Sequence, residues 1–138
     1  MELILHNADE YLHTSEPGVL RLPNDADVTA LASTHTLADV QRIELVFPKF
    51  TDGRAFSQAV ALRRRLGFAG DIRATGDVLA DQLLQMKRCG FSSAELRVDQ
   101  RLDIAQRELA RFDDFYQGDA QTVAPRFARA PINAAEAA

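Results

Sequence analysis

The chain has 138 residues, with 16 Lys and Arg against 20 Asp and Glu, so its formal net charge is −4. This length supports one hydrophobic core, and 46% hydrophobic beside 26% charged residues is typical of a globular protein. The negative charge argues against a general nucleic-acid-binding protein, and the single cysteine excludes a disulfide within the chain. No apolar run approaches the roughly 20 residues that a membrane-spanning helix needs. We therefore expect a single domain that binds neither nucleic acid nor membrane.

The cysteine usage fits a reducing compartment, and the beginning of the chain shows no export signal. Residues 1–11 carry Glu2, Asp9 and Glu10 and only a short apolar run, unlike the basic and apolar regions of a secretory signal. The expected location is therefore the cytoplasm.

Two short strands are predicted near the N-terminus, at residues 3–5 and 19–22, where Leu, Ile and Val predominate. Asp25 or Asp27 then stands where it can cap a short helix over residues 28–31. The sequence leaves open whether these two strands join the main sheet.

The centre of the chain predicts strand, helix, strand, helix and strand in succession. The first strand is the apolar run at residues 42–47, which Pro48 ends, and the first helix lies between Gly53 and Gly67. The remaining elements are a strand at residues 71–75, a helix from Asp77 to Cys89 that Gly90 ends, and a strand at residues 93–98. An amphipathic helix between two strands returns the chain to the same edge, so the strands are expected to be parallel. The predicted fold class is α/β, a small open sheet with a parallel βαβαβ core.

A last helix is predicted from about Gln100 to about Gln117 and should pack on the sheet. Its apolar residues recur at steps of three and four: Leu102, Ala105, Leu109, Phe112 and Tyr116. Beyond Gly118 the chain is rich in Ala, Pro and Arg and has no periodic apolar face. We therefore expect one domain over residues 1–118 and a flexible C-terminal tail over residues 119–138.

A ligand is expected at the carboxyl ends of the strands, because loops and helix N-termini converge there in an open parallel sheet. We call this end the carboxyl rim; it consists of the loops at residues 48–54, 75–77 and 99–101. Lys49 and Arg54 flank a helix N-terminus that favours anions, and Gly53 permits close backbone approach. Such a loop suits sulfate, phosphate or a carboxylate. Arg73, near the end of its strand, either reaches the same rim or crosses the sheet.

The same residues also have simpler interpretations. Asp52, Asp77 and Asp99 each precede a predicted helix, and an Asp that caps a helix needs no further role. Lys49 and Arg54 are also compatible with solvated loop charges.

Other reactive or charged groups give weaker indications. Residues 63–65 and 87–88 are basic, and they form either a surface for an acidic partner or charges that complement helix C-termini. Cys89 lies at a helix C-terminus, where we expect a raised pKa and no reactive role. The three histidines, His6, His13 and His35, show no metal-ligand spacing, and no nucleotide-binding fingerprint is present. We therefore predict no metal site.

Four ordered segments carry a family resemblance: residues 47–59, 62–63, 70–82 and 88–91. With these segments the chain resembles, from about residue 20 to about residue 117, a bacterial family called domain of unknown function nine-three-four. The resemblance implies the label of probable oxidoreductase and genes that lie beside those for assimilatory sulfite reductase and phosphoadenylylsulfate reductase. It supplies no cofactor and no catalytic residue, so both stay unknown.

The predicted site is a mixed-charge set at the carboxyl rim that matches the family pattern and binds an anion or a partner. Its members are Lys49, Thr51, Asp52, Gly53, Arg54, Arg73, Asp77, Asp81 and Gln82. Ser57, Gln58 and Gly76 match the pattern beside them.

The favoured hypothesis is a non-catalytic accessory protein of assimilatory sulfate or sulfite reduction that binds a sulfite reductase, another enzyme of the pathway or a sulfur oxyanion. One thiol without a cluster site cannot carry the multi-electron chemistry of sulfite reduction. The alternative is a stand-alone oxidoreductase or anion-substrate enzyme, in which Lys49, Arg54 and Arg73 hold the substrate and Asp77 or Asp81 moves a proton. A purely structural module is the third interpretation.

Overall fold

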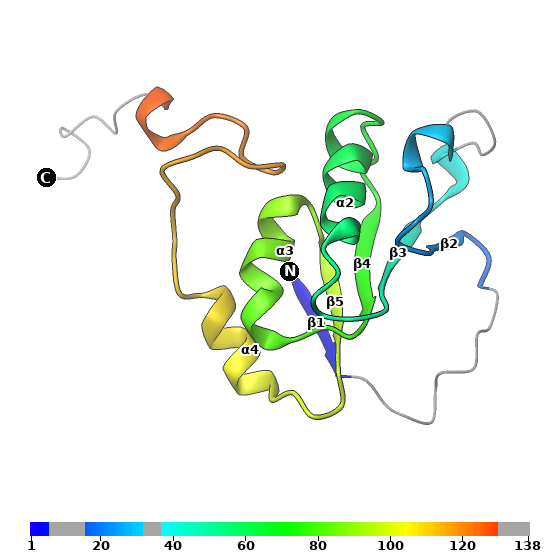
Figure 1. Ribbon diagram of the computed structural model, residues 1–138. Coiled ribbons are helices and arrows are strands. Elements are labelled where there is room, and N and C mark those ends of the chain that lie inside the picture. Colours follow the sequence, from blue (N-terminus) through cyan, green and yellow to red (C-terminus); the bar gives the residue numbers. More distant parts are fainter. Residues whose placement is uncertain (6–15, 32–36, 130–138) are drawn as a thin grey trace, which may run out of the picture.

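The computed structural model describes residues 1–5, 16–31 and 37–129, which form a sheet with helices on one side (Figure 1). The strands are β1 (Glu2–Leu5), β2 (Val19–Leu22), β3 (Arg42–Phe47), β4 (Asp71–Gly76) and β5 (Ser93–Leu96). The helices are α2 (Arg54–Arg64), α3 (Leu83–Cys89) and α4 (Leu102–Leu109). Four short 3₁₀ helices complete the described elements: η1 (Val28–Ala30), η2 (Leu37–Asp39), η3 (Ala80–Gln82) and η4 (Arg126–Ala128).

All five strands are parallel and lie in the order β1-β5-β4-β3-β2. The predicted α/β class and the parallel order of the three central strands are confirmed. The two N-terminal strands also join this sheet, and they lie at its opposite edges. The helices α2 and α3 connect neighbouring parallel strands, so each runs back from the carboxyl rim to the amino edge of the sheet.

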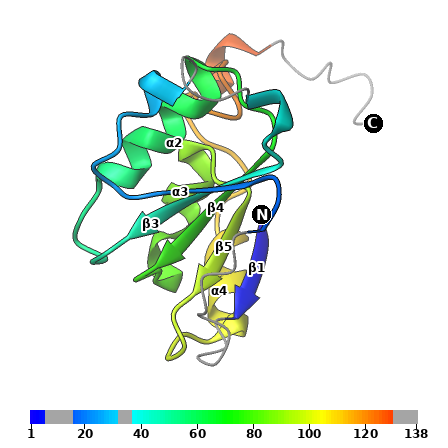
Figure 2. The same cartoon turned by 90° about the vertical axis from the view of Figure 1, so that its right-hand side faces the viewer.

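The core lies between the sheet and its helices. Figure 2, turned by 90° about the vertical axis, shows β3, β4 and β5 in front of α2 and α3. Alternate residues of β3 are buried, and Ile43, Leu45 and Phe47 have no exposed surface. The ring of Phe47 packs edge-on against Phe56 of α2 at 5.2 Å and tilts against Phe91 at 5.8 Å. This alternation shows that one face of the sheet packs on the helices.

The other sheet face carries charges in register. One row across the sheet consists of Arg21, Glu44, Arg73, Ser93 and Glu2. Two pairs of neighbours in this row are in contact: Arg21 Nη1 lies 3.4 Å from Glu44 Oε2, and Arg73 Nε donates to Ser93 Oγ at 3.0 Å. Opposite charges on adjacent strands stabilise this parallel register.

The second half of the chain differs from the prediction at two helix ends. Asp77 caps no helix, because its carboxylate binds other loops and the helical turns begin at Ala80. The predicted last helix is too long, since α4 ends at Leu109. Asp113 and Asp114 would lie in the final turns of a longer helix, where carboxylates oppose the helix dipole. Asp114 instead accepts a hydrogen bond from the backbone N–H of Phe115, a local contact that competes with helix.

Arg63, near the end of α2, holds three separate segments together. Its guanidinium donates to the carbonyl oxygens of Phe68 at 2.7 Å, Gly70 at 2.7 Å and Gly90 at 2.8 Å. Ser92 Oγ beside it accepts from the N–H of Ile72 at 2.9 Å. Arg63 therefore ties the end of α2 to the turns that precede β4 and β5, and it is not part of a basic surface.

We predict that Arg63→Ala lowers the free energy of unfolding by about 3 kcal/mol, because three carbonyl oxygens lose a charged donor. Arg64→Ala, one position along on the exposed side of α2, should change it by no more than about 0.5 kcal/mol. Urea denaturation followed by circular dichroism measures both. Equal losses in the two variants would show that Arg63 contributes only its charge near the helix end.

Candidate functional site

The loop between β3 and α2 is fixed to the carboxyl rim by its backbone. The N–H of Phe50 donates to Asp77 Oδ2 at 2.7 Å, and Gln82 Nε2 donates to the carbonyl oxygen of Phe50 at 2.8 Å. Both backbone groups of one residue are thus held by side chains that follow the next strand. The structure therefore brings three of the predicted segments together, those at Lys49–Arg54, Asp77 and Gln82.

Arg97, which directly follows β5, bridges the second and third loops of the rim. Its Nη1 donates to Asp77 Oδ1 at 2.6 Å, and its Nε donates to Asp99 Oδ1 at 2.6 Å. The hydrogen bond from Arg97 to Asp77 lowers the pKa of that carboxylate. The hydrogen bond from Arg97 to Asp99 lowers the pKa of Asp99 to about 2. Arg97 was absent from the predicted set, although an Arg between strand end and Asp99 is a signal for a local ion pair.

Asp52 occupies the position where an anion was expected. Its Oδ1 accepts from the backbone N–H of Arg54 at 3.2 Å, and its Oδ2 accepts from Arg54 Nη2 at 2.8 Å. Asn24 Nδ2 donates to the same Oδ2 at 2.7 Å. The hydrogen bond from the Arg54 side chain, assisted by the backbone, lowers the pKa of Asp52 to about 2. The chain thus supplies its own carboxylate to the start of α2 and to Arg54.

The remaining predicted rim residues are exposed: Lys49, Thr51, Gly53 and Asp81. Phe50, held between Asp77 and Gln82, leaves 45% of its surface exposed. Within the described part of the chain, the structure gives the Lys49 amine no hydrogen bond and no ion pair. The outermost groups of the rim are therefore a cation and an aromatic ring on one fixed loop.

Arg73 does not join the carboxyl rim. Its Nε donates to Ser93 Oγ at 3.0 Å, and its Nη2 lies 3.3 Å from Asp71 Oδ2, at the beginning of β4. It lines a cavity of about 450 Å³ at the amino edge of the sheet, together with Arg42 and Arg63. The predicted trio of Lys49, Arg54 and Arg73 is therefore not assembled.

Gln58 and Gly76, which match the family pattern, have structural roles. Gln58 is buried, and its Nε2 donates to the carbonyl oxygens of Pro23 and Ala26, both at 2.9 Å. Gly76 has a φ of 92°, and a Cβ there would lie 2.4 Å from the carbonyl oxygen of Phe47. A side chain at position 76 would force β3 and β4 apart where they end.

The structure places the cysteine of the chain but none of its three histidines. Cys89 is half-buried, and burial raises the pKa of its thiol. The three histidines lie outside the described residues. In the part of the chain that the structure describes, no three His, Cys, Asp or Glu side chains group as a metal site. No described helix is both long enough and apolar enough to cross a membrane.

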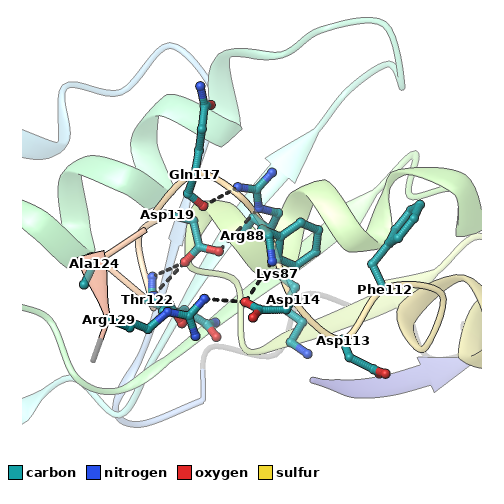
Figure 3. A pocket seen from close by; sticks show the side chains of 12 residues that line it. Lys87, Arg88, Phe112, Asp113, Asp114, Gln117, Asp119, Thr122, Ala124 and Arg129 are labelled. Carbon is teal, nitrogen blue, oxygen red and sulfur yellow. Dashed lines mark hydrogen bonds and ion pairs between the residues drawn. The ribbon is translucent and has the colours of Figure 1, made fainter. Parts of the chain in front are cut away.

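A small cavity that the sequence did not indicate lies between α3 and the segment after α4 (Figure 3). We call that segment, residues 110–129, the arm. Arg88 of α3 holds it: Nε lies 3.3 Å from Asp119 Oδ2, Nη2 donates to Gln117 O at 3.1 Å, and the guanidinium carbon lies 4.1 Å from the centre of the Phe115 ring. The N–H of Ala120 also donates to the carbonyl oxygen of Arg88 at 3.0 Å, so Asp119 and Ala120 lie beside α3. The domain boundary at residue 118 stays a prediction.

Residues 19–127 match the model of a family described as bacterial protein of unknown function (DUF934). The chain belongs to this family. The match covers β2 to β5, α4 and nearly all of the arm. No curated protein and no solved structure matches the chain.

The paired carboxylates of the rim predict a loss of stability in acid. Asp77 and Asp99 have lowered pKa values when folded, so their contribution is present above the unfolded value of about 4 and is lost as the pH falls through the folded values, which is about 2 for Asp99. In Arg97→Gln the largest cause of the lowering is removed, and the melting temperature should fall less between about pH 5 and about pH 2 than in the wild type.

Thermal melts across this pH range measure the difference. Arg107→Gln, at an exposed position on α4, is the matched control and should keep the wild-type acid profile. An unchanged profile in Arg97→Gln would mean that this ion-pair network does not link folding to protonation.

Proposed function

We propose that the chain is a non-catalytic accessory protein of assimilatory sulfate or sulfite reduction and that it binds a reductase through its carboxyl rim. The resemblance described above supports the pathway, since it implies genes beside those of sulfite reductase. Membership in a bacterial family of unknown function is compatible with such a role. The choice of a protein partner rests on the geometry of the rim.

The observation that carries the proposal is the fixed presentation of Phe50. Asp77 and Gln82 hold its N–H and carbonyl oxygen, while its ring stays 45% exposed next to the exposed Lys49. Aromatic anchors on rigid backbone are typical of protein interfaces, because little conformational entropy remains to be lost on binding. A ring and a cation on such a loop favour a partner surface with an apolar pocket and an acidic group.

The rim is less suited to a small oxyanion. Asp52 already pairs with Arg54 and accepts the first amide of α2. Arg97 is shared between Asp77 and Asp99. A free anion at this place would have to displace a carboxylate that belongs to the chain.

The geometry also gives no support to Asp77 as a proton carrier. Both of its carboxylate oxygens accept hydrogen bonds, from Phe50 N–H and from Arg97, and its pKa is lowered. A general acid or base at neutral pH needs a pKa near 7, which requires a shift in the opposite direction. This favours a binding role over catalysis at the rim.

Co-purification tests the proposal. The tagged chain, expressed in a bacterium that carries the neighbouring reductase genes and grows on sulfate, should retain sulfite reductase or another enzyme of the pathway. Lys49→Glu combined with Phe50→Ser should weaken this retention about tenfold or more, because the ring and the cation anchor the contact. Arg64→Glu, the same charge change at the far end of α2, should leave it unchanged.

A deletion strain provides the functional measurement. We expect slower growth on sulfate and lower sulfite reductase activity, both restored by the wild-type gene but not by the Lys49→Glu/Phe50→Ser form. Normal growth and activity in the deletion strain, together with no co-purified reductase, would exclude the proposed function.

A further inference from the structure

The cavity at the amino edge of the sheet gathers three arginines from three separate elements. Arg42 begins β3, Arg63 lies near the end of α2 and Arg73 lies in β4, and all three line this cavity of about 450 Å³. The carboxylates in the same lining are those of Asp71 and Glu2. The lining residues therefore carry an excess of one positive charge.

A single carboxylate oxygen lies between two of these guanidinium groups. Asp71 Oδ2 is 3.3 Å from Arg42 Nε and 3.3 Å from Arg73 Nη2. The hydroxyl groups of Ser92 and Ser93 also donate to Asp71 Oδ1, at 2.6 Å and 2.7 Å. Asp71 thus keeps the two arginines close together, while its own two oxygens are shared among four donor groups.

These arginines keep donors that the chain itself does not use. Arg42 Nε is buried and makes no hydrogen bond, although Asp71 Oδ2 lies 3.3 Å away. The other carboxylates near Arg42 are those of Glu16 and Glu44, at 3.5 Å and 3.7 Å from its Nη1. Within the described residues, Arg73 Nη1 has neither a hydrogen-bond partner nor an ion pair. A buried donor without an acceptor is costly, so these groups indicate a place for a further acceptor.

Among the described residues, Arg63 adds a charge that forms no ion pair. It donates to three carbonyl oxygens, and its Nη2 lies 3.4 Å from Ser92 Oγ, so every group that it binds is neutral. Burial lowers the pKa of Arg63, because removal from water disfavours a cation. An anion in the cavity would offset this cost of burial.

We propose that the amino-edge cavity binds a small oxyanion, with Arg42 and Arg73 as direct donors and Arg63 as a nearby positive charge. Guanidinium groups recognise oxyanions such as phosphate and sulfate through paired N–H donors. A volume of about 450 Å³ has room for such an ion with several waters, each of which takes about 30 Å³. The site is independent of the proposed reductase binding, because it uses neither Lys49 nor Phe50.

Isothermal titration calorimetry with sodium sulfate and sodium phosphate at constant ionic strength tests the site. We expect saturable binding of at least one of these ions, with a dissociation constant of about 1 mM or below, and none of chloride. The tighter of the two identifies the preferred ion. Arg42→Gln and Arg73→Gln should each weaken this binding about tenfold or more, because each removes a charged donor. Arg21→Gln, on the same sheet face but outside the cavity lining, is the matched control and should bind like the wild type.

Thermal melts in chloride show whether each variant is folded before it is titrated. Where a Gln variant does not fold, Arg42→Lys or Arg73→Lys replaces it; both keep the charge but lose the planar donor pair, so binding should still weaken. Crystals grown with sodium selenate, an anomalous scatterer with the charge and shape of sulfate, then locate the ion, which we expect beside Arg42 and Arg73. The proposal is overturned by the absence of binding of both oxyanions, by equal affinities in Arg21→Gln and the cavity variants, or by selenate bound only elsewhere.

Discussion

The guanidinium of Arg63 is the group on which the amino edge of the sheet depends. Three carbonyl oxygens from two different turns accept hydrogen bonds from it. The close approach of Gly90 follows from the same contact: its φ is 112°, and a Cβ at this position would lie 2.5 Å from Cγ of Arg63. Arg63 and Gly90 therefore require each other.

The carboxyl rim is built on a similar principle, with side chains that brace backbone. Asp77 and Gln82 hold the first loop, and Arg97 connects Asp77 with the loop after β5. Polar residues that match the family pattern at the rim, such as Asp77 and Gln82, therefore form hydrogen bonds with other parts of the same chain. Two exposed groups take no part in these side-chain contacts and can contact a partner: the ring of Phe50 and the amine of Lys49.

Local patterns predicted most of the fold. The strand at Arg42–Phe47, the helix that ends at Gly90 and the parallel order of the central strands all follow from apolar periodicity and from turn residues. The end of α4 at Leu109 was missed, because the apolar period continues to Tyr116 while Asp113 and Asp114 act against a helix there. Periodicity alone does not weigh that electrostatic cost.

The candidate site was predicted less completely, since long polar side chains choose partners across the fold. The sequence places Arg73 near a strand end, but it cannot show that the guanidinium turns back to Ser93 and Asp71. Arg63 and Arg88 read equally well as surface charges, yet Arg63 clamps backbone and Arg88 holds the arm. These roles depend on segments that are distant in sequence, which a single sequence does not bring together.

The direction of the helices decides where the arm lies relative to the carboxyl rim. Because α3 runs back from the carboxyl rim, its last residues, Lys87 to Cys89, lie at the amino edge of the sheet, beside the arm. Phe50 lies at the opposite end, fixed by Asp77 beyond the carboxyl end of β4. A partner that covers the carboxyl rim would therefore leave the arm uncovered.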